Sequence, residues 1–171
     1  MPLERVIRVD PPRVEDDPWL LVEPVEGELP RGAIAVPLAA WRSRRDELLA
    51  RTERIGVWLG SEDDPAILGG DMQALSLVAV KFPKAADGRG YSTAVLVRRL
   101  GYRGELRAFG DIGRDHLLQL RRCGFDAFNL PAGRDPEAAL AAFREFSVFY
   151  QASFEQPAPL FRRRELSGDS A

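Results

Sequence analysis

The residues best suited to binding chemistry fall in one stretch, KFPKAADGRGYS at positions 81–92. It follows the most apolar run of the chain, residues 75–80, and precedes a helical pattern, so we expect it to leave the carboxyl end of a strand. Lys81 and Lys84 are the only lysines, against 22 arginines, which indicates that a compact ammonium is wanted at this strand end. Arg89 adds a bidentate donor for an oxyanion, and amides at a helix N-terminus also favour anions.

We therefore predict an anion site on this loop, where two glycines allow a tight turn or a close approach to a ligand. The candidate ligand-binding residues are Lys81, Asp87, Gly88, Arg89, Gly90, Tyr91 and Ser92. The alternative is a solvated loop in which Asp87 is a turn residue. The spacing matches neither the Walker pattern nor GxGxxG, so it does not predict a nucleotide site.

A second set of polar residues, in the run RAFGD at 107–111, occupies the same place on the next predicted strand. Arg107 is a further candidate anion ligand. Asp111 has two readings, an acid/base or cation-positioning residue and, more commonly for this type, a helix cap. An enzyme would use Lys81 as an electrophile or Schiff-base amine and Asp111 as the acid/base. Cys123, near a helix C-terminus, is expected to be an inert packed thiol, and no spacing predicts a metal site.

Alternating strands and helices must position these groups. Strands are expected at residues 55–59, 75–80, 105–109 and 125–130, separated by roughly one helix each, and residues 33–36 form a further short apolar run. This pattern predicts an α/β protein with a mostly parallel sheet of βαβ units, whose ligands gather beyond the carboxyl ends of the strands. An open sandwich is the first choice. A partial (β/α) barrel is the alternative, because Glu105 and Arg107 share one strand face and could line a polar interior. The last helix is expected over residues 136–153, with Ala139, Phe143, Phe146 and Tyr150 on its apolar stripe.

The chain has 171 residues and a net charge of -2, which fits one domain and argues against a dedicated nucleic-acid binder. We expect a proline-rich acidic segment over residues 1–30, with a short strand at 19–22, one α/β domain over 31–156 and a disordered tail over 157–171. No apolar run reaches the roughly 18–20 residues of a membrane span, and the start lacks a signal-peptide pattern, so a cytoplasmic protein is expected. One cysteine excludes an internal disulfide.

Two surface features suggest contacts with other proteins. The arginines at 98, 99, 103, 121 and 122 form either a solvated helical face or a patch for an acidic partner. The aromatic residues at 146, 149, 150 and 154 are expected mostly in the core, with an interface between copies in a homo-oligomer as the alternative.

Three motifs, DGRGYS (87–92), GELRAFGD (104–111) and RCGFDAF (122–128), resemble the bacterial family called domain of unknown function 934. The resemblance covers roughly residues 20–155. It implies a link to sulfur metabolism, because genes of this family often lie beside those of sulfite reductase and sulfate assimilation. Its members are often labelled as oxidoreductases of sulfite reduction. The resemblance implies no established catalytic residue.

The first hypothesis is an accessory or anion-binding protein of sulfite reduction, with sulfite reductase as partner and a small oxyanion as ligand. The alternatives are an enzyme acting on a small phosphorylated or sulfonated molecule and an oxidoreductase with an unrecognised bound cofactor. Electron transfer requires a flavin, haem, metal or dithiol, and the sequence identifies none of them. Whether the protein is an enzyme therefore stays open at this stage.

Overall fold

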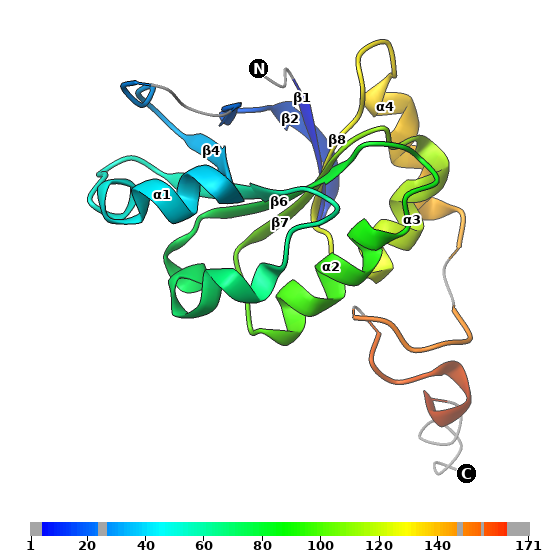
Figure 1. Cartoon of the computed structure of the whole chain (residues 1–171). Coiled ribbons are helices and arrows are strands. Elements are labelled where there is room, and N and C mark those ends of the chain that lie inside the picture. Colours follow the sequence, from blue (N-terminus) through cyan, green and yellow to red (C-terminus); the bar gives the residue numbers. More distant parts are fainter. Residues whose placement is uncertain (1–4, 24–26, 147–148, 155, 164–171) are drawn as a thin grey trace.

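The protein is built on one eight-stranded sheet that curls into a half-barrel, with helices packed against it (Figure 1). The structure, a computed structural model, describes residues 5–23, 27–146, 149–154 and 156–163. The strands are β1 Arg5–Val9, β2 Pro12–Asp16, β3 Leu20–Leu21, β4 Ile34–Pro37, β5 Ile55–Leu59, β6 Leu77–Phe82, β7 Glu105–Gly110 and β8 Ala127–Asn129. The helices are α1 Leu38–Leu49, α2 Arg89–Arg99, α3 Arg114–Arg122 and α4 Pro136–Ala139, with 3-10 segments η1 Pro65–Ala74 and η2 Leu140–Arg144.

The strand order is β2-β1-β8-β7-β6-β5-β4-β3. Strands β3 to β8 run parallel to their neighbours, whereas β1 pairs antiparallel with both β8 and β2. The predicted α/β fold with a mostly parallel sheet is thereby confirmed. The strand predicted at 55–59 has the same bounds as β5. The strand predicted at 75–80 begins and ends two residues earlier than β6, which spans Leu77–Phe82.

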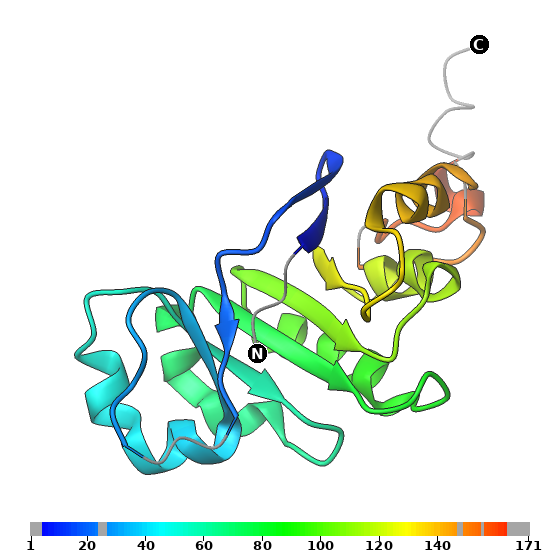
Figure 2. The same ribbon diagram turned by 90° about the horizontal axis from the view of Figure 1, so that it is seen from above.

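The curvature of the sheet follows from its connectivity. Strands β2 and β3 form the two opposite edges, yet only residues 17–19 separate them in the sequence. Four Cα–Cα steps span at most about 14 Å, so the edges must approach one another and the sheet must curl. Figure 2 shows the blue amino-terminal segment running from the edge beside β8 to the edge beside α1. The partial barrel considered from the sequence therefore describes this sheet.

Side chains alternate between the two faces of the sheet. The outer face carries Val78, Val80 and Phe82 of β6, which belong to the main hydrophobic core together with residues of α1, α2 and α3. The inner face carries a second, smaller apolar cluster that includes Ala79 and Phe109. Strand β6 is thus covered on both faces, which explains its nearly continuous apolar sequence.

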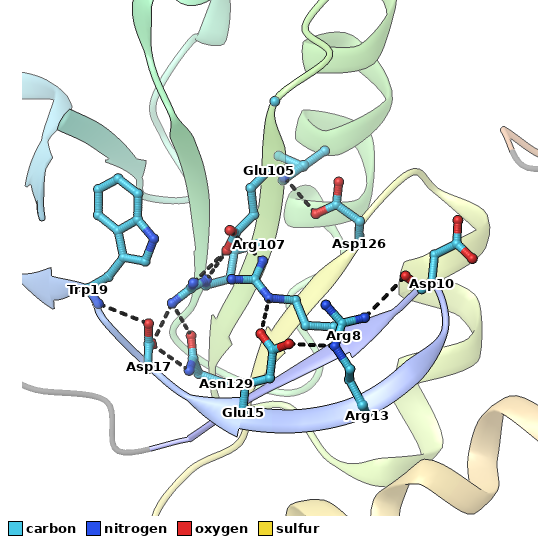
Figure 3. Close-up of polar contacts among 12 residues, drawn as sticks. Arg8, Asp10, Arg13, Glu15, Asp17, Trp19, Glu105, Arg107, Asp126 and Asn129 are labelled. Atoms are coloured by element: carbon cyan, nitrogen blue, oxygen red, sulfur yellow. Dashed lines mark hydrogen bonds and ion pairs between the residues drawn. The ribbon is translucent and has the colours of Figure 1, made fainter. Parts of the chain in front are cut away.

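The inner face also holds a buried polar network, centred on Arg107 (Figure 3). The Arg107 guanidinium donates to Asp17 Oδ2 at 2.5 Å, to Glu105 Oε1 at 2.5 Å and to Asn129 Oδ1 at 3.1 Å. Asn129 Nδ2 in turn donates to Asp17 Oδ2 at 2.9 Å, and the Arg107 and Asp17 side chains are both 0% exposed. The network therefore ties the segment between the two sheet edges to strands β7 and β8.

The structure revises the two ends of the sequence prediction. The helix predicted over residues 136–153 is wrong in length, because α4 passes into η2 and ends at Arg144. Ala139 and Phe143 of the predicted stripe are buried, but Phe146 and Tyr150 are 60% and 70% exposed, so no core contact stabilises a longer helix.

At the amino-terminal end, the segment 1–30 contributes three strands to the same sheet, including the expected strand at 19–22 as β3. Of the tail predicted to be disordered, residues 164–171 lie outside the described part of the chain. Within that described part, no helix has both the length and the apolar character needed to cross a membrane.

We predict that Asp17→Ala lowers the free energy of unfolding by about 3–5 kcal/mol, because it leaves the Arg107 charge buried without its partner. Urea unfolding followed by circular dichroism measures this loss. The matched control is Asp16→Ala, since the adjacent Asp16 side chain is 100% exposed and its loss is expected to cost about 0.5 kcal/mol or less. Equal stability of the two variants would contradict the role given to the network.

Candidate functional site

The inner mouth of the half-barrel, at the carboxyl ends of the parallel strands, contains the strongest candidate for ligand binding. Lys81 is the last inward-facing residue of β6, and it is aligned with Phe109 of β7. The Lys81 Nζ atom lies 5.3 Å from the centre of the Trp58 ring. Trp58 is held in place by Phe109, edge-on at 6.3 Å between ring centres, and by a 3.0 Å hydrogen bond from its Nε1 to Val22 O.

The Lys81 ammonium group lies against an aromatic ring and away from acidic side chains. An ammonium group above an indole face is attracted by the ring quadrupole, and this attraction exists only for the charged form. Among the residues that the structure describes, no carboxylate oxygen lies within 4.0 Å of Lys81 Nζ. The Lys81 ammonium group is therefore positioned by the indole ring and is not paired with a described carboxylate.

Arg89 differs from Lys81 in this respect, because carboxylates already hold its guanidinium. Asp87 accepts from Arg89 Nε and Nη2, both at 2.9 Å, and Glu62 forms an ion pair with Arg89 Nη1. Asp87 also accepts from the Ser61 hydroxyl at 2.6 Å. These contacts tie the 81–92 loop to the loop after β5, so the arrangement explains Arg89 as a structural residue.

The N-terminus of α2 is likewise occupied by a group of the protein. The helix starts at Arg89, whose backbone amide donates to Asp87 Oδ1 at 3.1 Å. A carboxylate at this position accepts a hydrogen bond from the amide, and its negative charge interacts favourably with the positive end of the helix dipole. An incoming anion would meet the negative charge of Asp87 there, which leaves the half-buried Lys81 and the exposed Lys84 as the cations of the predicted loop site.

The remaining candidates of the loop have packing roles or lie in solvent. A Cβ atom on Gly90 would come within 2.4 Å of the Phe82 ring, so this glycine allows α2 to approach β6. Tyr91 packs edge-on against the same ring at 5.5 Å, and burial raises the pKa of its phenol. Gly88 and Ser92 are exposed, and a Cβ on Gly88 would meet no atom within 4 Å.

The two candidates on the next strand are placed differently from one another. Asp111 lies beside the loop, where its Oδ2 accepts from the Ala85 amide at 3.0 Å. It follows Gly110, whose φ of 102° and close approach to the Phe82 carbonyl require a glycine. Arg107 is aligned with Ala79, one inward position below Lys81, and its hydrogen bonds go to the buried network instead of the loop.

Sequence reasoning missed Trp58 and two of the three partners of Arg107, Asp17 and Asn129. Trp58 had a signal, because an aromatic residue with one polar group near the end of a strand commonly lies where apolar and polar surroundings meet. Asp17 and Asn129 had none, since they lie 90 and 22 residues from Arg107 in the sequence. Within the described residues, no group of three or more histidine, cysteine or acidic side chains could hold a metal ion.

The fold and the mouth residues define an α/β half-barrel with a cation at the carboxyl edge of its sheet. A family model described as "bacterial protein of unknown function (DUF934)" matches residues 56–161, and the chain belongs to this family. The match spans β5 to η2 and includes Lys81 and the whole loop. Searches of curated proteins and of solved structures gave no match.

We predict that Gly90→Ala destabilises the protein by about 1–3 kcal/mol, because the added methyl group overpacks the contact with Phe82. Phe82 cannot yield easily, since it packs between Tyr91 and Phe125. Gly88→Ala is the control and is expected to cost clearly less, because the added methyl group meets open space. Thermal unfolding compares the two variants, and the reverse order would show that Gly90 is not a packing residue.

Proposed function

We propose that this protein is a cytoplasmic accessory protein of sulfite reduction that binds a small oxyanion at the mouth of the half-barrel. Lys81 is the residue that contacts the anion. The observation that carries the proposal is the position of its ammonium group, held over Trp58 at the carboxyl end of a central strand and not paired with a described carboxylate. The link to sulfite reduction rests on the family resemblance alone.

The physical chemistry of the site favours binding over covalent catalysis. An ammonium group offers three donors to a compact anion such as sulfite, sulfate or phosphate. Lys81 is half-buried, where a charge–charge attraction is stronger than in bulk water. A Schiff-base mechanism would need a base to take a proton from the amine, and no described carboxylate lies within 4.0 Å of Lys81 Nζ. The other proposed catalytic residue, Asp111, is engaged with the Ala85 amide.

We predict that Lys81→Ala abolishes oxyanion binding, whereas Lys84→Ala retains it. Lys84 is the only other lysine and is exposed three residues away, so it is a matched control for loss of charge. Sulfite, sulfate and phosphate are titrated separately, with tryptophan fluorescence and melting temperature as readouts. Trp58 is the half-buried tryptophan, so its emission is expected to report a nearby anion.

An anion at a hundred times its dissociation constant is expected to stabilise the wild type by about 2.7 kcal/mol. The same shift in Lys81→Ala would place the anion elsewhere and contradict the proposal. Absence of any shift in the wild type would exclude the anion-binding role under those conditions.

The accessory role needs a separate test, which uses a strain that lacks this gene and grows with sulfate as its sulfur source. We predict slower sulfite turnover in that strain, with recovery on expression of the wild type or Lys84→Ala and none with Lys81→Ala. Association with sulfite reductase is measured by co-purification from the same cells. Normal sulfite turnover together with no association would overturn the proposed pathway.

A further inference from the structure

A groove lies on the helical side of the molecule, between α2, α3 and the segment 149–154, which we call the carboxyl-terminal strap. It encloses a cavity of about 480 Å³. The cavity is lined by Val95, Arg99, Gln119, Arg122, Cys123 and residues 151–154. The lining residues belong to α2, α3, the turn after α3 and the strap, all on the outer side of the sheet. Lys81 faces the inner side, so the groove is separate from the oxyanion site.

Two arginines hold the strap in place and form a wall of the groove. Arg98 lies 5.4 Å from the Phe154 ring and donates to Gly124 O at 2.9 Å. Arg122 stacks at 4.6 Å on the ring of Phe149, and its backbone carbonyl accepts from the Phe154 amide at 3.1 Å. The Arg122 Nε atom is buried and has no hydrogen-bond partner within the described part of the chain.

The surface around the groove combines exposed apolar groups with an excess of positive charge. Leu96 and Leu100, one turn apart on the outer side of α2, are 46% and 48% exposed, and Phe154 of the strap is 48% exposed. The segments 92–104, 114–126, 149–154 and 156–163 contain eight arginines and two acidic residues, although the whole chain has a net charge of -2. One of these acidic residues, Asp126, pairs with Arg98 at 2.8 Å. Arginine and aromatic residues are enriched at protein interfaces.

We propose that this groove binds an acidic segment of a partner protein. An apolar side chain of that segment enters the cavity between α2 and α3, and its carboxylates pair with Arg99 and Arg122. The positive charge selects an acidic partner, because like charges across an interface are unfavourable. The inference goes beyond the oxyanion site and does not depend on it.

Fluorescence anisotropy tests the charge preference with a labelled peptide of glutamates around one central leucine. A peptide with lysines in place of the glutamates is the charge control. We expect saturable binding of the acidic peptide that weakens as salt is raised, because salt screens exposed charges. Arg99→Glu is expected to weaken binding at least tenfold, whereas Arg42→Glu, at an exposed arginine of α1, leaves it unchanged. Arg99→Gln removes the charge without reversing it and is expected to give an intermediate loss of peptide binding. This variant replaces Arg99→Glu in the test if the charge reversal affects folding.

The only cysteine of the chain, Cys123, lines the cavity and reports where the peptide binds. Burial raises the pKa of its thiol, so alkylation is followed by mass spectrometry at alkaline pH. We expect the acidic peptide to slow alkylation several-fold in the wild type and not in Arg99→Glu.

Three results would overturn the inference: equal binding of the two peptides, equal binding by Arg99→Glu and Arg42→Glu, or unchanged alkylation at saturating acidic peptide. A dimer seen by sedimentation without peptide, and lost in Arg99→Glu, would also overturn it, because a second copy would then cover the groove. Each of these results leaves the Lys81 titration unaffected, so the two proposals fail independently.

Discussion

The ion pair between Arg107 and Asp17 lies where the connection between the two sheet edges meets the centre of the sheet. It joins the middle of the sheet to the segment that crosses between its two edges, and both side chains are fully buried. A buried ion pair contributes little net stability, because desolvation offsets most of the attraction, but it strongly disfavours arrangements that separate the two charges. We infer that the network selects the curled form of the sheet.

The protein treats its positive charges in different ways. Inside the sheet, Arg107 is neutralised by Asp17 and Glu105, and on the 81–92 loop Arg89 is neutralised by Asp87 and Glu62. Lys81 rests on an aromatic ring, which positions its charge without cancelling it. Arg122 similarly stacks on the Phe149 ring, whereas Arg98, beside the Phe154 ring, also pairs with Asp126 at 2.8 Å. Both proposed binding sites thus contain a cation that lies against an aromatic ring.

Local patterns in the sequence were sufficient to predict the parallel core and one residue of the site. The continuous apolar run of β6 and the position of Lys81 at its end could be read directly. The β1–β2 hairpin was missed, because its short strands carry prolines and charges and one of them pairs with β8, far away in the sequence. The structural role of Arg89 could not be predicted either. The sequence shows that a guanidinium donor is present, but not whether nearby carboxylates already accept its hydrogen bonds. Interactions between distant residues decided each of these outcomes.

The pairing of β1 with β8 has a consequence for how the chain acquires its structure. Ile7 is aligned with Phe128, so more than two thirds of the chain must be synthesised before the first strand can find its partner. Strands β4 to β7 and their helices can form earlier, because their neighbours are close in sequence. During synthesis, β1 therefore remains unpaired with β8 for some time, and the inner face of the open sheet is exposed until this pairing forms. Closure of the half-barrel is expected to be a late step, limited by the search for a distant contact.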